Sequence, residues 1–437
     1  MGLHSRTSMR DHLSIALALA AIGCLATVFG CGGPGDSSHG PDGGSDTPSR
    51  CHFDLPDTLE LGGRPSAITV ADLDDDGCLD LVALVALPPS PDVRGPVALV
   101  VAWGDSVAPY DQRSTRLLPG DAGTTVSGDP TARDSSSRVL SVTDFDGDGN
   151  ADVVTAGGIA LRDGARSFGW QGFPDEEQQL LQPVVAVDLD GTGQRVVRGT
   201  RAGQVEICTA AGSCEVLPGQ PEACSPDVNC AIQDVAVGDF DHDGRPDVIG
   251  GGWPLEPPFA NVSRLWLSSE NHDAPREVAI EFVDYVTGDL DGDGFVDLVA
   301  PMAEFISDFP SHTLVWLSDP AAPDSFVRRQ EILNAENHND NAALADVNDD
   351  GCLDYLTTGV DRGAVFIRLG NPRPEGGCTG LLGDHDPAVS VDSGGWSRFP
   401  VGGGVGIQQL DVNGDGNADW VLRELAADLR FISPPTL

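Results

Sequence analysis

Short apolar runs alternate with polar turns along most of the chain. Val235–Val237 and Asp247–Ile249, for example, lie on either side of a strongly acidic segment. Runs of this length that are rich in β-branched residues and bounded by Gly, Asp or Pro are typical of β-strands. After the N-terminal apolar segment, no stretch keeps the period of an amphipathic helix. The pattern therefore predicts an all-β protein.

The acidic segment is one copy of a motif, D-x-D-x-D-G-x-x-D, that recurs along the chain. We number its seven copies as acidic loops 1 to 7, of which loop 3 is degenerate. Their bounds are Asp72–Asp80, Asp144–Asp152, Asp188–Val196, Asp239–Asp247, Asp289–Asp297, Asp346–Asp354 and Asp411–Asp419. Apolar runs flank each copy, and a third run and usually a weaker fourth follow. Seven units of about 55 residues match the size of four-stranded blades, which predicts a seven-bladed β-propeller.

The two ends of the repeat region indicate how such a ring would close. The last unit ends after Asp428–Ser433, which corresponds to its third strand. An extra apolar stretch, Phe53–Leu61, precedes the first acidic loop. We predict that Phe53–Leu61 completes the seventh blade, because closing the ring in this way removes unpaired strand edges.

The motif supplies the ligands of a hard metal ion. Positions 1, 3, 5 and 9 offer carboxylate or amide oxygens, position 7 offers its carbonyl, and glycine at position 6 permits a sharp turn. This number of oxygen ligands suits calcium rather than zinc or copper. Several carboxylates on one turn also repel each other without a cation. An EF-hand is excluded, because position 12 is never Glu; an acidic turn without any ion is the alternative.

Six of the seven loops fill the four side-chain ligand positions with Asp or Asn, so we predict about six calcium sites. Loop 3 has Thr192 at position 5 and Val196 at position 9, and we predict that it is empty. The predicted ligands, with position 7 acting through its carbonyl, are Asp72, Asp74, Asp76, Cys78 and Asp80; Asp144, Asp146, Asp148, Asn150 and Asp152; Asp239, Asp241, Asp243, Arg245 and Asp247; Asp289, Asp291, Asp293, Phe295 and Asp297; Asp346, Asn348, Asp350, Cys352 and Asp354; Asp411, Asn413, Asp415, Asn417 and Asp419.

The N-terminus is typical of an exported protein. Residues 1–30 combine a basic start with an apolar run and are interpreted as a signal peptide. The segment ending in Cys31 resembles a bacterial lipoprotein box, which implies lipidation of Cys31. Cys24 is a second candidate, and ordinary secretion is the alternative. Residues 31–50 are polar and rich in Gly, Ser and Asp, and are interpreted as a flexible tether. Residues 51–437 form the predicted propeller domain.

The charge of the chain excludes several functions. With 25 Lys+Arg against 68 Asp+Glu, the net charge is −43. A surface this acidic repels phosphate backbones, which argues against nucleic acid as a partner. The chain has no lysine, which excludes Schiff-base lysine chemistry and a phosphate-binding loop of the Walker type.

The acidic loops resemble the FG-GAP/VCBS-type repeats of the integrin alpha-subunit N-terminal propeller and of many bacterial surface proteins. The resemblance covers about Cys51 to Leu437. It implies a calcium-stabilised propeller in which each acidic loop joins the first and second strands of its blade on one face. Ligands would then bind the opposite face. Together with the lipoprotein box, it implies a cell-surface or periplasmic location at the outer membrane of a bacterium, with membrane contact only through the lipid.

Eight cysteines remain after Cys24 and Cys31 are set aside, an even number that favours disulfides in an exported chain. The resembling fold places Cys51, Cys78, Cys352 and Cys378 on the calcium face, which implies the pairs Cys51–Cys78 and Cys352–Cys378. Cys208 and Cys214 flank a short turn and form a candidate pair across a hairpin. Cys224 and Cys230 form a fourth candidate pair. A Cys/His zinc site is the competing interpretation.

The candidate ligand-binding residues lie in long loops predicted for the opposite face. They are Trp253, Phe259, Phe305 and Phe309, together with Glu336 and His338 in the polar segment Asn334–Asn341. Aromatic side chains in such loops stack on sugars or hold a peptide; the alternative is that they pack over blade edges. Esterase, metalloprotease and dinucleotide motifs are missing. The leading hypothesis is therefore a non-catalytic propeller that binds a protein or polysaccharide. A carbohydrate-active enzyme (a polysaccharide lyase or hydrolase) and a scaffold subunit of an envelope complex are the alternatives.

Overall fold

The computed structural model describes residues 51–432, apart from residues 52, 57, 88–95, 122–138, 175–182, 201, 221–231, 253–261, 279–284, 303–311, 320, 334–341, 349, 360–363, 384–390, 393–406, 411–418 and 424–427. From residue 391 onward only the backbone is described. All described residues belong to the unit Gly44–Leu437. Among them, no helix is long and apolar enough to cross a membrane.

The described residues form an all-β structure whose strands group into seven four-stranded antiparallel sheets. In the first five sheets, consecutive strands are neighbours. Sheet 1 consists of β2 (Arg64–Ala71), β3 (Asp80–Ala86), β4 (Pro96–Ala102) and β5 (Arg113–Asp121). Sheet 2 consists of β6 (Ser141–Thr143), β7 (Asp152–Thr155), β8 (Gly158–Gly164) and β9 (Ser167–Gly172). Sheet 3 consists of β10 (Val184–Val187), β11 (Arg195–Gly199), β12 (Val205–Cys208) and β13 (Cys214–Val216).

Sheets 4 and 5 repeat the same order. Sheet 4 consists of β14 (Ile232–Gly238), β15 (Asp247–Gly252), β16 (Val262–Trp266) and β17 (Pro275–Val278), with a 3-10 helix, η1 (Ser268–Glu270), between its last two strands. Sheet 5 consists of β18 (Val286–Gly288), β19 (Asp297–Met302), β20 (His312–Asp319) and β21 (Ala322–Leu333).

The last two sheets depart from this order. Sheet 6 consists of β22 (Ala342–Ala345), β23 (Asp354–Gly359), β24 (Ala364–Arg368) and β27 (Val391–Asp392), and a separate hairpin, β25 (Gly370–Pro372) and β26 (Cys378–Leu382), is inserted before its last strand. Sheet 7 consists of β28 (Ile407–Leu410), β29 (Asp419–Arg423), β30 (Asp428–Ile432) and the N-terminal strand β1 (Thr58–Glu60). Leu59 of β1 pairs with Leu429 of β30.

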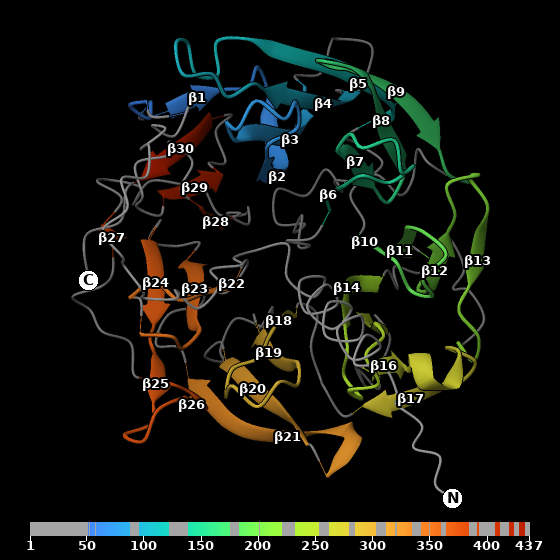
Figure 1. Cartoon of the computed structure of the whole chain (residues 1–437), viewed down its shortest axis with the longest axis vertical. Helices are drawn as coiled ribbons and strands as arrows, with labels where there is room; N and C mark the ends of the chain where they lie inside the picture. Colours follow the sequence, from blue (N-terminus) through green and yellow to red (C-terminus); the bar gives the residue numbers. More distant parts are fainter. Residues whose placement is uncertain are drawn as a thin grey trace, which may run out of the picture. The chain divides into compact units, whose positions relative to one another are not determined.

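The first strand of each sheet lies beside the first strand of the next, in the order β2, β6, β10, β14, β18, β22, β28 (Figure 1). Strand β2 also contacts β29 and β30 of sheet 7. Neighbouring four-stranded sheets that contact each other through their first strands define a β-propeller-like fold.

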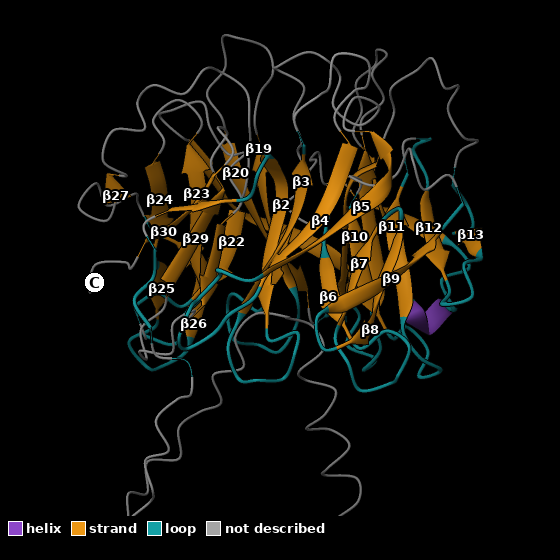
Figure 2. Ribbon diagram, turned by 90° about the horizontal axis from the view of Figure 1, so that it is seen from above, coloured by secondary structure: helices purple, strands orange, loops and turns teal. Residues whose placement is uncertain are grey.

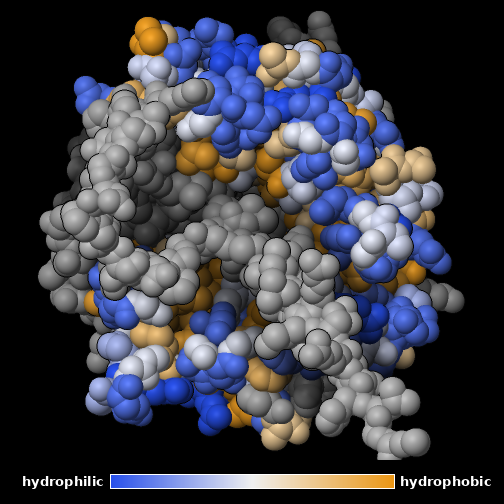
Figure 3. All heavy atoms as spheres, in the orientation of Figure 1, coloured by the Kyte–Doolittle hydropathy of each residue, from blue (hydrophilic) through white to orange (hydrophobic). Residues whose placement is uncertain are grey.

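The hydrophobic core lies between the sheets. Alternate residues of β3 belong to different clusters: Leu81 packs with residues of β1, whereas Val82 packs with residues of sheet 2. Trp103 of sheet 1 stacks on Phe168 of sheet 2, with ring centroids 6.2 Å apart. Strand β3 therefore buries both faces, which accounts for an apolar run that is continuous rather than alternating. Hydrophilic residues (blue) cover much of the described surface in Figure 3.

Candidate metal sites

Each acidic loop joins the first and second strands of its sheet, from loop 1 between β2 and β3 to loop 7 between β28 and β29. Adjacent loops touch each other: the His242 ring of loop 4 stacks on the Phe295 ring of loop 5, with centroids 4.2 Å apart. The described loops (teal) lie mostly along one edge of the strands in Figure 2. Of loop 7, only the backbone of Asp419 at the start of β29 is described.

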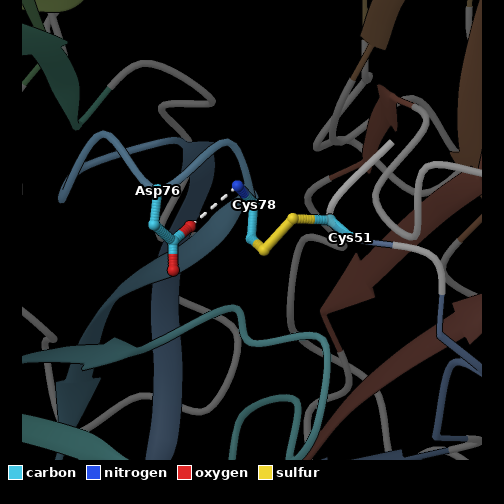
Figure 4. Close-up of side chains that lie close together, drawn as sticks. All are labelled: Cys51, Asp76 and Cys78. Carbon is cyan, nitrogen blue, oxygen red and sulfur yellow. Dashed lines mark hydrogen bonds between the residues drawn. A yellow bond between two sulfur atoms is a disulfide. The ribbon is translucent and has the colours of Figure 1, made fainter. Parts of the chain in front are cut away.

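Hydrogen bonds within the loop explain its fold, and loop 1 shows the pattern. The Asp72 carboxylate accepts the backbone N–H of Asp76 at 3.2 Å and that of Gly77 at 3.0 Å. The Asp76 carboxylate accepts the N–H of Cys78 at 2.8 Å (Figure 4). Gly77 has a φ of 87°, in the left-handed region that glycine adopts without strain. The carboxylates at positions 1 and 5 thus hold the turn as well as offering oxygens to an ion.

Position 4 also lies in the left-handed region, which the motif analysis did not identify. Asp75, Gly147, His242 and Gly292 have φ values of 59°, 78°, 59° and 73°. Gly, Asp and His are among the residues that tolerate this conformation best. The Gly, Asp and His residues at position 4 could therefore have predicted the left-handed turn from the sequence.

The aspartate at position 9 is buried and joins the loop to the third strand of its sheet. In loop 1, Asp80 accepts the N–H of Leu73 and the N–H of Gly104, each at 2.7 Å. The same pair of bonds recurs at Asp152, Asp247, Asp297 and Asp354, at distances of 2.7–3.0 Å. Position 9 was predicted only as a metal ligand; its backbone contacts show that it also organises the loop.

Burial shifts the ionisation of these aspartates. Desolvation, together with the neighbouring loop carboxylates, raises the pKa of Asp80, Asp247 and Asp297 to about 7 and that of Asp354 to about 6, although the backbone hydrogen bonds oppose the shift. A carboxylate that is costly to ionise in the free loop gains most from a cation beside it.

The loop carboxylates converge as a cation site requires. In loops 1, 2 and 4, carboxylate oxygens of positions 1, 3 and 9 lie within 4.8 Å of one another. At position 3, Asp74 Oδ1 and Asp291 Oδ1 are buried and have no hydrogen-bond partner. A buried acceptor without a partner is costly, and a hard cation would satisfy it. The donor set, made of carboxylates and carbonyls, therefore fits calcium.

Arginines hold the outer oxygens of the same position-3 carboxylates. Arg166 Nε lies 2.8 Å from Asp74 Oδ2, and Arg166 Nη2 lies 3.8 Å from an oxygen of Asp76. Arg373 in the β25–β26 hairpin lies 3.9 Å from Asp291 Oδ2. Each arginine contacts Oδ2 and leaves Oδ1 without a hydrogen-bond partner.

Loop 3 differs from the others in its contacts. The guanidinium of Arg195 lies 3.8 Å from Asp190 and donates a hydrogen bond of 2.8 Å to Thr192. Position 9 is Val196, a fully buried side chain in the core between sheets 2 and 3. Loop 3 lacks the carboxylate at position 9; its internal arginine has a counterpart in loop 4, where Arg245 Nη2 lies 2.8 Å from Asp243 Oδ2.

The described residues contain three disulfides, and these match three predicted pairs. Cys51–Cys78, Cys208–Cys214 and Cys352–Cys378 have Cα–Cα distances of 5.2, 4.0 and 5.6 Å. Cys78 and Cys352 occupy position 7 of loops 1 and 6, and Figure 4 shows Cys51 bonded to Cys78 beside Asp76. Sulfurs engaged in disulfides are not available to zinc. The pair Cys224–Cys230 lies outside the described residues.

The other predicted functional residues also lie outside the described part of the chain. They are Cys31, Trp253, Phe259, Phe305, Phe309, Glu336 and His338, with Asp411, Asn413, Asp415 and Asn417 of loop 7.

Comparison with known proteins gives structural neighbours only. No protein-family model matches the sequence, and no curated protein matches it. A crystal structure of BBS1N in complex with ARL6DN, soaked with mercury, is 12% identical, with a TM-score of 0.48 over 89% of this chain and 98% of that chain. The same complex soaked with lead is also 12% identical, with a TM-score of 0.46 over 87% of this chain and 97% of that chain. A crystal structure of the V. cholerae biofilm matrix protein Bap1 is 12% identical, with a TM-score of 0.43 over 84% of this chain and 76% of that chain.

Proposed function

We propose that this chain is a calcium-stabilised β-propeller of the FG-GAP/VCBS type, anchored to the bacterial envelope by a lipid on Cys31. In this proposal it binds a protein or polysaccharide and catalyses no reaction. One observation carries the calcium assignment: buried position-3 oxygens of Asp74 and Asp291 lack a hydrogen-bond partner in loops built of carboxylates.

The proposal includes a closed ring of seven blades. The pairing of β1 with β30 supports it, as does the contact of β2 with β29 and β30. The core cluster that joins Leu59 of β1 to Leu81 and Ala83 of sheet 1 is a further support. In a closed ring, each calcium loop would fix the crossing from the first to the second strand of one blade.

Equilibrium dialysis of the full chain against calcium tests the assignment. We expect about six ions per chain, because six loops carry a full ligand set. The variant Asp291→Ala should lose one ion, since it removes both oxygens at position 3 of loop 5. The matched control Asp190→Ala changes the same position of loop 3 and should leave the number unchanged. Fewer than two ions bound by the folded chain would overturn the assignment.

The ligand is tested separately. The full chain is incubated in calcium with a panel of polysaccharides, and the size of each polymer is followed by gel filtration. Co-elution of an intact polymer with the protein supports a glycan-binding module, and a polymer that shrinks identifies an enzyme instead. If neither occurs, a protein partner is sought by cross-linking on intact cells.

A further inference from the structure

Within the described residues, Arg162 of β8 contacts two acidic loops at once. Its backbone N–H donates to Asp152 Oδ1 of loop 2 at 2.8 Å. Its guanidinium donates to Asp75 Oδ2 of loop 1 at 3.0 Å and to the Leu73 carbonyl of the same loop. It also donates to the Asn150 side-chain oxygen of loop 2. The side chain is only 4% exposed.

These partners are tied directly to predicted calcium ligands. The N–H of Leu73 binds Asp80 at 2.7 Å, so the same residue contacts a ligand of loop 1 and Arg162. Asn150 occupies position 7 of loop 2, and its N–H and side-chain NH₂ each donate to Asp148 at 2.7 Å. Arg162 therefore contacts predicted ligands of loop 2 directly and is one residue away from the ligand Asp80 of loop 1.

The fold itself does not require an arginine at this place. Each position-9 aspartate whose side chain is described accepts one N–H from its own loop and one from a residue in or just after the third strand. In the other described sheets with a complete loop, this second donor is small: Gly104, Ser268, Ser318 and Gly370. A Cβ on Gly104 would approach the Leu79 carbonyl oxygen to 2.5 Å, so the position even excludes a side chain there. Sheet 2 alone among these five combines the bond to position 9 with a long cationic side chain that reaches the neighbouring loop.

We propose that Arg162 couples calcium binding at loops 1 and 2, an inference that rests on the proposed calcium function. An ion in loop 2 fixes Asp152, Asp148 and Asn150, and this fixes the backbone and guanidinium of Arg162. The guanidinium then holds Leu73 and Asp75 in the arrangement that loop 1 needs for its own ion. Binding at one loop removes part of the ordering cost at the other, and by linkage the effect is reciprocal.

Arg162 could couple the loops through the geometry of its guanidinium or through its positive charge alone, and a lysine variant distinguishes these two explanations. A lysine would retain the positive charge but not the planar fork that reaches three oxygens together. If Arg162 acts through geometry, Arg162→Lys loses the coupling. If only its charge acts, Arg162→Lys behaves as the parent chain does.

Hydrogen exchange followed by mass spectrometry gives a local measure of loop 1 in the full chain. The calcium concentration at half-protection of the segment Asp72–Asp80 is compared between the parent chain and Asp148→Asn, which removes the negative charge of the position-5 ligand of loop 2. We expect this midpoint to rise about tenfold, within the usual range of coupling between sites. In the Arg162→Lys background, the same Asp148→Asn change should leave the midpoint unmoved.

Asp350→Asn is the matched control, since it alters position 5 of loop 6, which Arg162 does not contact; it should not move the midpoint of loop 1. An unmoved midpoint in Asp148→Asn, or an equal shift in the Arg162→Lys background, would overturn the coupling. If Arg162→Lys does not fold, Arg162→Gln takes its place, and the comparison of Asp148→Asn with Asp350→Asn still decides whether loops 1 and 2 are linked. If no loop gains protection with calcium, the proposed function fails rather than the coupling alone.

Discussion

The aspartates at positions 9 and 5 of an acidic loop differ in burial and in their hydrogen-bond partners, as loop 5 shows. Asp297 accepts the N–H groups of Leu290 and Ser318 at 2.8 and 2.9 Å and is 1% exposed. Asp293, at position 5 of the same loop, is exposed and accepts the N–H of Phe295 at 2.9 Å. The first residue holds the sheet together, whereas the second mainly offers an oxygen to an ion.

Substitutions at these two positions should therefore separate stability from metal binding. Asp297→Asn places an amide NH₂ where an N–H must be accepted, and we expect a loss of about 1–3 kcal/mol in the free energy of unfolding even without calcium. Asp293→Asn should leave the stability of the calcium-free chain nearly unchanged. Both should weaken calcium binding at loop 5, because each removes one negative charge from the ligand set. Urea unfolding in chelator measures the difference; equal stability of the two variants would contradict the structural role.

The raised pKa values make a prediction about pH. The folded-state pKa of Asp80, Asp247 and Asp297 is about 7, whereas the pKa of an aspartate in the unfolded chain is about 3.9. Between these values the folded state binds more protons than the unfolded state, so the stability of the calcium-free chain rises as pH falls from about 8 towards about 4. With saturating calcium the ionised carboxylates are stabilised, and we expect the trend to weaken or reverse.

Melting temperatures of dialysed, metal-free chain at pH 5.5 and pH 8, at equal ionic strength, check this prediction. The net charge of −43 acts in the same direction, because repulsion also decreases as carboxylates are protonated. Asp297→Asn therefore serves as a control: it retains the general repulsion but loses one of the shifted groups, so its pH dependence should be smaller.

Residue-level prediction from the sequence succeeded where the information is local. The motif spacing identified which residues converge in loops 1, 2 and 4, because nine consecutive residues determine the turn. It did not identify Arg162 or Arg166 as partners of loop 1, since both come from the β8–β9 hairpin of the next sheet. Contacts of this kind depend on how blades pack, which no local pattern encodes.

At the scale of elements, the disulfides connect the acidic loops to the segments around them. Cys352–Cys378 ties loop 6 to the β25–β26 hairpin across 26 residues, and Arg373 of that hairpin reaches Asp291 of loop 5. Cys208–Cys214 spans only 6 residues, from the end of β12 to the start of β13. The two bonds therefore differ in how much they restrict the unfolded chain.

Replacing each pair by serine should show this difference. Chain-entropy arguments give a loss of about 3.5 kcal/mol for Cys352→Ser/Cys378→Ser and about 2 kcal/mol for Cys208→Ser/Cys214→Ser. We also expect weaker calcium binding at loop 6 in the first variant only, because Cys352 supplies the position-7 carbonyl. Urea unfolding and calcium dialysis of both variants measure these effects. A larger loss of stability in the Cys208/Cys214 variant would contradict the entropy argument.

The sequence predicted the inner strands of each sheet better than the outer ones. A third apolar run was predicted after each acidic loop, and β16, β20 and β24 are such third strands. The β25–β26 hairpin was not expected, because three- and five-residue strands around Gly and Pro carry no clear period. Short strands at the outer edge are determined by their partner strand more than by their own residues.

For the whole molecule, the acidic loops should lower the free energy of unfolding when they hold no ion and raise it when calcium is bound. Many of the 68 acidic residues lie in the acidic loops, and the contacts of Arg162, His242 and Arg373 join loop 1 to loop 2, loop 4 to loop 5, and the β25–β26 hairpin to loop 5. Without ions these loops repel one another across the edge of the sheets. Calcium would remove this repulsion and hold the first two strands of each blade together, so the free energy of the whole unit should depend on calcium more than any single substitution suggests.

Removal of calcium from the full chain is the broadest test of this view. Each site occupied at 100 times its dissociation constant adds about 2.7 kcal/mol to the stability of the folded state. Loss of several such sites should lower the melting temperature by roughly 10 °C or more in a strong chelator at neutral pH. The decrease should reverse when calcium is restored. It should be only partly reversed by magnesium, because loops with this many oxygen ligands favour the larger ion. An identical melting curve in chelator and in calcium would contradict calcium stabilisation while leaving the arrangement of the sheets untouched.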